Sequence, residues 1–63
     1  MNTEMYAIIF EKEGKRDYRV GTTYIDLPNS TLENHRKKLE KDGAVIKKIL
    51  LGSGSWDAAA SQI

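Results

Sequence analysis

The segment NSTLENHRKKLEKDGA, residues 29–44, constrains the fold most because it carries markers of both ends of a helix. Ser30 and Glu33 have the spacing of a capping box, in which each side chain bonds an otherwise unpaired backbone N–H. Lysines crowd the last two turns, where the helix dipole favours cations. Gly43 stands where a left-handed residue closes many helices. The segment therefore predicts a helix over residues 31–42.

Two runs before this helix have the character of strands. YAIIFE, residues 6–11, and DYRV, residues 17–20, alternate or are rich in β-branched and aromatic residues, and the charged stretch between them centres on Gly14. They predict a β-hairpin whose better core face holds Tyr6, Ile8 and Phe10. Gly21 predicts a bulge or bend. Residues 22–27 either extend the second strand or form a short strand of their own.

A third strand is predicted after the helix, over AVIKKILL, residues 44–51. The predicted fold is α+β, a β-hairpin–helix–β-strand (ββαβ) with a three-stranded antiparallel sheet and one helix packed on one face. The helix offers only Leu32 and Leu39 to the core. We expect a single small α+β domain over residues 1–51, followed at 52–63 by a Gly/Ser spacer and a flexible tail that contains the tryptophan.

A sheet covered on one side leaves its second face open. Strand parity places Ala7, Ile9, Ile46 and Leu50 on that face, where they would form an apolar patch. Patches of this kind on small chains often mark interaction sites.

The tail SWDAAASQI holds Trp56, the one tryptophan of the chain. Three placements are open for its side chain: against its own core, on a partner, or in a disordered tail. Ser55 could cap a short helix here, although a helix this short needs a surface on which to dock. Tryptophan is enriched among interface hot spots, so we expect Trp56 to contact a partner.

A chain of 63 residues buries only a small core, which disulfides, a metal or association usually stabilise. The sequence has no cysteine and one histidine, which excludes disulfides and a Cys/His zinc site. We expect no metal and no small-molecule cofactor, and association with a protein partner or a second copy remains.

Catalysis finds little support in the sequence. Motifs for phosphate loops, dinucleotides, zinc proteases and EF-hands are missing. His35 is the single candidate general base, and no spacing assembles a nucleophile beside it. We expect His35 to cover the edge of the core between Leu32 and Leu39, and the protein not to be an enzyme.

A nucleic-acid-binding module is the alternative function. The segment 35–48 is basic although the whole chain has a net charge of +1 and a pI near 8.0. Glu40 and Asp42 interrupt it, and a solvated helix face is the simpler explanation of its charge. The residues that would contact phosphates, or steer a protein partner, are Arg36, Lys37, Lys38, Lys41, Lys47 and Lys48.

Two stretches, YAIIFEKEGKRDYRV and IDLPNSTLEN, resemble the start of a HicB-type antitoxin domain. In that family a hairpin leads to an Asp-Leu-Pro segment and then to a helix that begins Thr-Leu-Glu. The sequence departs from the pattern because the residues that usually separate Leu-Pro from the helix are missing. The resemblance implies a cytoplasmic bacterial or phage protein that binds another protein.

These observations together predict a small non-catalytic regulatory or accessory protein of the kind that phages and plasmids carry. It would act by binding another protein, or as a homodimer. No apolar run approaches the length of a membrane span and the N-terminus lacks the pattern of a signal peptide, so we expect a soluble, cytoplasmic protein. The expected contact residues are Trp56, Ile9, Ile46 and Leu50.

Overall fold

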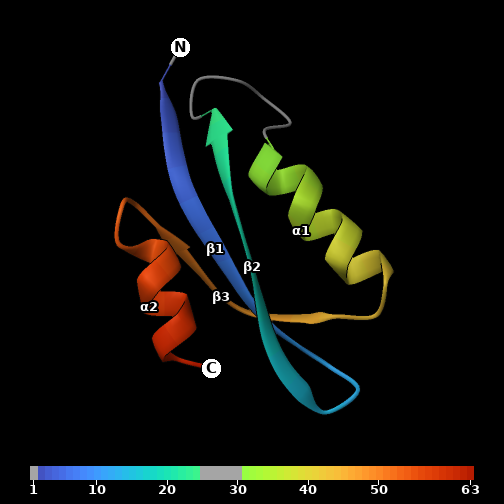
Figure 1. The fold of residues 1–63 in the computed structure, drawn as a ribbon. Helices are drawn as coiled ribbons and strands as arrows, with labels where there is room; N and C mark the ends of the chain where they lie inside the picture. The colour runs from blue at the N-terminus through green and yellow to red at the C-terminus, as the bar shows by residue number, and fades with distance from the viewer. Residues whose placement is uncertain (1, 25–30) are drawn as a thin grey trace.

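The computed structural model describes residues 2–24 and 31–63, and it confirms an α+β fold with a three-stranded antiparallel sheet. The strand order is β2-β1-β3, so β1 is the central strand. The predicted capping residue Ser30, the end of the predicted strand and Pro28 lie outside the described residues. The elements along the chain are β1 (Thr3–Lys12), β2 (Lys15–Tyr24), α1 (Thr31–Lys41), β3 (Val45–Leu51) and α2 (Ser55–Ser61) (Figure 1).

The hairpin of β1 and β2 keeps one register along its whole length, from Thr3 opposite Tyr24 to Lys12 opposite Lys15. The two residues of its turn both have positive φ, 54° at Glu13 and 78° at Gly14, as a type I′ turn requires. A turn of this kind matches the twist of the strands that it joins. The second strand therefore runs on to Tyr24 as one extended element.

The predicted bulge at Gly21 is wrong, because the register passes through Gly21 unbroken and places it opposite Tyr6. Glycine serves a different purpose here. A Cβ atom at this position would lie 2.6 Å from the hydroxyl oxygen of Tyr6 and 2.7 Å from its Cζ. The missing side chain lets the Tyr6 ring approach the backbone of β2 at Gly21.

The face of the sheet under α1 holds the larger core. Tyr6, Ile8 and Phe10 of β1 are buried there with Ala44. The N–H of Leu32 donates to Thr23 Oγ1 at 3.2 Å, which ties the start of α1 to the end of β2. The half-buried residues that pack against this core are Leu32, Leu39, Ile46 and Ile49.

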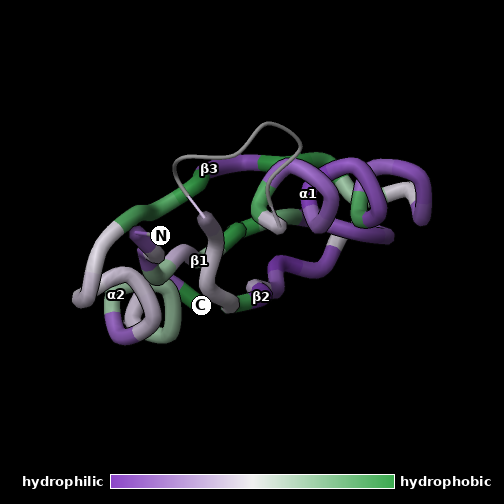
Figure 2. The backbone as a smooth tube through the Cα atoms, turned by 90° about the horizontal axis from the view of Figure 1, so that it is seen from above, coloured by the Kyte–Doolittle hydropathy of each residue, from purple (hydrophilic) through white to green (hydrophobic). Residues whose placement is uncertain are grey.

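The opposite face of the sheet is covered by α2, so the predictions of one helix, an open face and a flexible tail are wrong. Gly52 turns the chain with φ of 105°, and its N–H donates to the carbonyl of Met5 at 2.9 Å. Ala59 is then buried against Ala7 and Ile9. Seen from above, the two helices lie on either side of β1 (Figure 2). The C-terminal segment thus covers the face of the sheet that α1 leaves uncovered.

Strand β3 contains the irregularity that sequence parity could not predict. Lys48 pairs with Ile9 and Ile46 pairs with Phe10, which leaves Lys47 as an extra residue in a β-bulge. The bulge moves the β3 residues before Lys47 to the opposite face of the sheet from the one that simple alternation would give them. Ile46 therefore packs under α1, while Leu50 packs under α2 with Ile9, and the predicted shared face of Ile9, Ile46 and Leu50 is wrong for Ile46.

The contact between Gly21 and Tyr6 predicts the sign of a substitution. Gly21→Ala would stabilise an unobstructed strand by about 0.5–1 kcal/mol. Against the Tyr6 ring we expect it to lower the free energy of unfolding by about 1–3 kcal/mol. Urea unfolding followed by circular dichroism measures the difference, and a variant more stable than the wild type would contradict this packing.

Helix α2 contains a buried polar atom that predicts a stabilising change. Gly54, and not Ser55, is the N-cap residue, and the buried Oγ of Ser55 makes no hydrogen bond with the described residues. A buried unpaired hydroxyl costs about 1–3 kcal/mol, so Ser55→Ala should raise the free energy of unfolding by about 1 kcal/mol. Ser61→Ala is the matched control, because Ser61 is exposed and its hydroxyl donates to the Asp57 carbonyl within one helical turn. Equal effects of the two substitutions in thermal unfolding would refute this account.

Candidate functional site

Trp56 lies in the first turn of α2, and the helix brings its indole onto β2. The indole N–H donates to the Gly21 carbonyl at 3.3 Å, yet the residue remains 38% exposed. Val20 pairs with Ala7, so the Val20 side chain lies on the face of the sheet that α2 covers. Val20 is 37% exposed. We call Val20, Gly21 and Trp56 the Trp56 surface.

The other predicted contact residues do not extend this surface. Ile9 is 2% exposed beneath α2, and Leu50 is half-buried in the same cluster. Ile46 lies on the α1 face. Trp56 therefore takes a position between two of the predicted alternatives, since it contacts its own sheet while a large part of its ring stays in solvent.

The basic residues of the segment 35–48 are spread over two elements. Arg36 forms ion pairs with both Glu33 and Glu40, the second with Nη1 and Oε1 2.6 Å apart. These pairs raise the pKa of Arg36 and lower that of Glu33, in each case chiefly through their mutual hydrogen bond. Lys48 pairs with Ile9 and so faces the α2 side. The segment does not form a single basic surface.

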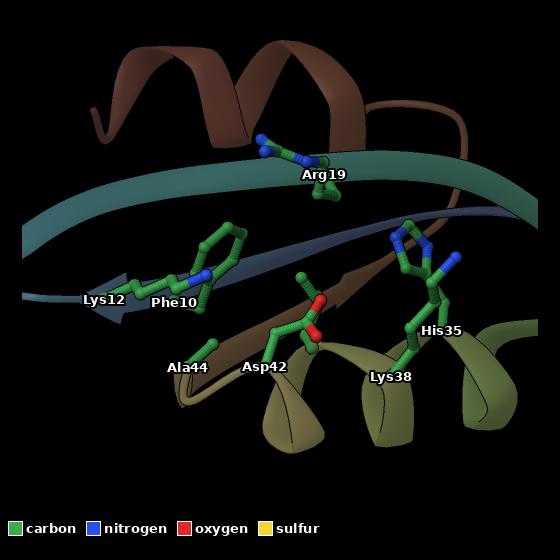
Figure 3. Close-up of a pocket in the computed structure, with 8 residues that line it drawn as sticks. Phe10, Lys12, Arg19, His35, Lys38, Asp42 and Ala44 are labelled. Atoms are coloured by element: carbon green, nitrogen blue, oxygen red, sulfur yellow. The ribbon is translucent and has the colours of Figure 1, made fainter.

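A different set of charged residues meets around a pocket of about 290 Å³ on the α1 face. We call it the basic pocket. In Figure 3, Phe10 and Lys12 lie at one end of the space between α1 and the sheet, His35 and Lys38 lie at the other, and Arg19 extends along β2. The lining residues are Phe10 and Lys12 of β1, Arg19 of β2, His35, Lys38 and Leu39 of α1, and Asp42 and Ala44 after α1.

Arg19 is the best-held cation of the basic pocket. Its guanidinium lies over the Phe10 ring at 5.4 Å from the ring centre. Its Nη1 donates to Asp17 Oδ2 at 3.0 Å and to the Tyr18 carbonyl at 2.9 Å. The pKa of Asp17 is lowered, first by the backbone N–H of Tyr18 and then by Arg19. These contacts fix the direction of the guanidinium without removing it from the pocket.

His35 joins the basic pocket to the core through Tyr6. The Tyr6 hydroxyl and His35 Nδ1 are 2.7 Å apart, and the two rings meet edge-on. Burial lowers the pKa of His35, and the nearby Arg19 and Lys38 lower it further. Burial also raises the pKa of Tyr6. The imidazole therefore takes up a proton less readily, and the phenol loses its proton less readily, than the same groups in water.

The described residues hold no group of three His, Asp or Glu side chains that could bind a metal ion. Within residues 2–24 and 31–63, no helix has the length and apolarity needed to cross a membrane. Comparisons of the chain with protein-family models, with curated proteins and with solved structures give no match. The likeness to HicB-type antitoxins therefore stays a resemblance.

Lys12 and Arg19 lie outside the basic segment 35–48, and in the sequence Asp42 is only an interruption of that segment, whereas the basic pocket combines residues of three elements. The register of the hairpin determines which face of the sheet Arg19 occupies. A two-residue turn at Glu13 and Gly14 places Arg19 opposite Ile8, on the core face and within reach of the helix.

The lowered pKa of His35 predicts how stability depends on pH. Because the folded state binds a proton less readily than the unfolded state, stability is complete above the ordinary pKa of 6.5 and falls as the pH drops below it. The lowered carboxylate pKa values of Asp17 and Glu33 act only at lower pH. We expect the melting temperature to fall between about pH 7.5 and pH 5.5, and His35→Gln to flatten this part of the curve. Parallel curves for the two proteins would contradict the assignment.

Proposed function

We propose that this is a non-catalytic accessory or regulatory protein that acts by binding another protein through the Trp56 surface. The observation that carries the proposal is the state of Trp56. Its indole is anchored to the Gly21 carbonyl and still 38% exposed, beside an equally exposed Val20. Tryptophan concentrates binding energy when it is buried on association.

The anchor supports this proposal because it fixes the ring before a partner arrives. A side chain that is already held loses less conformational freedom on binding. The indole also belongs to a helix that is packed on the sheet through Ala59. The exposed part of the ring is therefore presented in one orientation, which favours a specific contact.

The edge of β2 favours contact through side chains over strand addition. Asp17 Oδ1 accepts the N–H of Tyr18 at 2.7 Å, and Arg19 donates to its carbonyl. Side chains that occupy backbone groups of an edge strand compete with pairing to another chain. A partner would accordingly meet the face of β2 and α2.

A second copy of the chain is the simplest partner, because a two-fold axis at the Trp56 surface would place two indoles against each other. The net charge of +1 puts little repulsion in the way of self-association. Nucleic-acid binding by the segment 35–48 has less support, since two glutamates pair with Arg36 and Lys48 faces the other side of the sheet.

The chain supplies a matched pair of variants to test this proposal. Val20→Lys places a charge beside Trp56, while Val45→Lys makes the same change at a valine that is 58% exposed on the other edge strand. We expect Val20→Lys to weaken association at least tenfold, about 1.4 kcal/mol, and Val45→Lys to leave it unchanged. Sedimentation equilibrium measures the mass, and the single tryptophan reports its own burial by a blue shift of its fluorescence.

A wild-type mass of one chain at every concentration would exclude the second copy. A photo-crosslinker at position 20 or at position 45 then tests for another protein in a lysate of the source cells. Adducts that form from position 20 and disappear in the Trp56→Ala background support the proposal. The same adducts from both positions, or none from position 20, would refute it.

A further inference from the structure

We propose that the basic pocket binds a phosphate group, carried either by a small molecule such as a nucleotide or by a nucleic-acid strand. The pocket lies on the α1 face, opposite the Trp56 surface, so the proposal does not depend on the protein-binding role. Its ligand chemistry follows from the charge, the donors and the size of the pocket.

Three cations reach the basic pocket from three different elements: Lys12 from β1, Arg19 from β2 and Lys38 from α1. Lys12 and Lys38 form no ion pair with the described residues, whereas Arg19 is paired with Asp17 at 3.0 Å. Asp42 is the one acidic residue of the lining. Three cations therefore stand against two carboxylates, Asp17 and Asp42, and an excess of one positive charge remains.

The surroundings of His35 indicate a positive potential at the same place. Arg19 and Lys38 both disfavour the protonated imidazole, and burial adds to their effect. Nδ1 is engaged by the Tyr6 hydroxyl. In the tautomer in which Nδ1 accepts the Tyr6 proton, Nε2 carries a hydrogen that it can donate to an anion. His35 would thus add a neutral donor to the three cationic ones.

Arg19 is suited to a phosphate because a guanidinium can give two parallel hydrogen bonds to its oxygens, while the lysines act as flexible point charges. The apolar side chains of Phe10, Leu39 and Ala44 complete the lining. The charged residues beside them are exposed to solvent, namely Lys12, Arg19, Lys38 and Asp42. Sulfate, which has the same shape, should compete.

The volume of about 290 Å³ limits how much of a ligand can enter. It lies at the lower end of the range of about 300–1,000 Å³ for small-molecule sites. One phosphate group and part of its substituent would fit, and the remainder of the ligand would lie outside. A nucleotide and the backbone of a strand present the same group, so the experiment has to separate them.

Asp42 provides the sharpest test, because it opposes any anion in the pocket. Asp42→Asn should tighten binding severalfold, whereas Arg19→Gln should weaken it about tenfold through loss of a charge-assisted pair. Lys48→Gln is the matched control: it removes one positive charge on the opposite face of the sheet and should change little. Asp42→Asn does not touch the stacking of Arg19 on Phe10, so it keeps the test valid if Arg19→Gln unfolds.

The probes are inorganic phosphate, a nucleoside monophosphate and a short single-stranded oligonucleotide, each titrated at low ionic strength and followed by the amide signals of Arg19 and Lys38. Tightest binding of the monophosphate assigns a small-molecule ligand. Tightest binding of the oligonucleotide, with affinity falling steeply as salt rises, assigns a strand. The proposal is overturned if no probe binds at millimolar concentration, or if Lys48→Gln weakens binding as much as Arg19→Gln does. It is equally overturned if Asp42→Asn does not tighten binding.

Discussion

The burial of β1 on both of its faces is the constraint on which the rest of this structure depends. Its five residues Tyr6 to Phe10 are all at most 4% exposed, although alternate side chains point to opposite sides of the sheet. Burying one large apolar side chain contributes about 1.5–3 kcal/mol, so neither side of such a strand can stay in water cheaply in a chain this small. One helix covers Tyr6, Ile8 and Phe10, and a second one is needed for Ala7 and Ile9.

Local markers predicted the elements whose formation depends on local chemistry. The helix expected at residues 31–42 is found at Thr31–Lys41, and the hairpin and third strand are present. Helix α2 was foreseen only as a fragment in need of a docking surface, because three alanines carry little apolar periodicity. The bulge at Lys47 could not be predicted from the sequence, because β3 has apolar residues on both faces and either register would bury some of them. In both cases the deciding contact lies in β1, far away in sequence.

One of the two candidate sites could be predicted from the sequence, and the other could not. Trp56 could be singled out from composition alone, because a lone tryptophan in a tail of small residues has few uses. The basic pocket could not, because its cations are 7 to 26 residues apart along the chain and meet only when the hairpin register and the helix position are both known. The charge of the segment 35–48 instead predicted a contact through Arg36, which forms ion pairs with two glutamates.

Gly21, which belongs to the Trp56 surface, also contacts the residue that connects the core to the basic pocket. On one side of β2 its missing side chain admits the Tyr6 ring, whose hydroxyl bonds His35 at the basic pocket. On the other side its carbonyl accepts the indole N–H of Trp56. A change at Gly21 therefore disturbs both sites and cannot tell them apart. The two residues before it can, because Arg19 pairs with Ile8 and faces α1, while Val20 pairs with Ala7 and faces α2. Substitutions at two adjacent positions of one strand therefore act separately on the basic pocket and on the Trp56 surface.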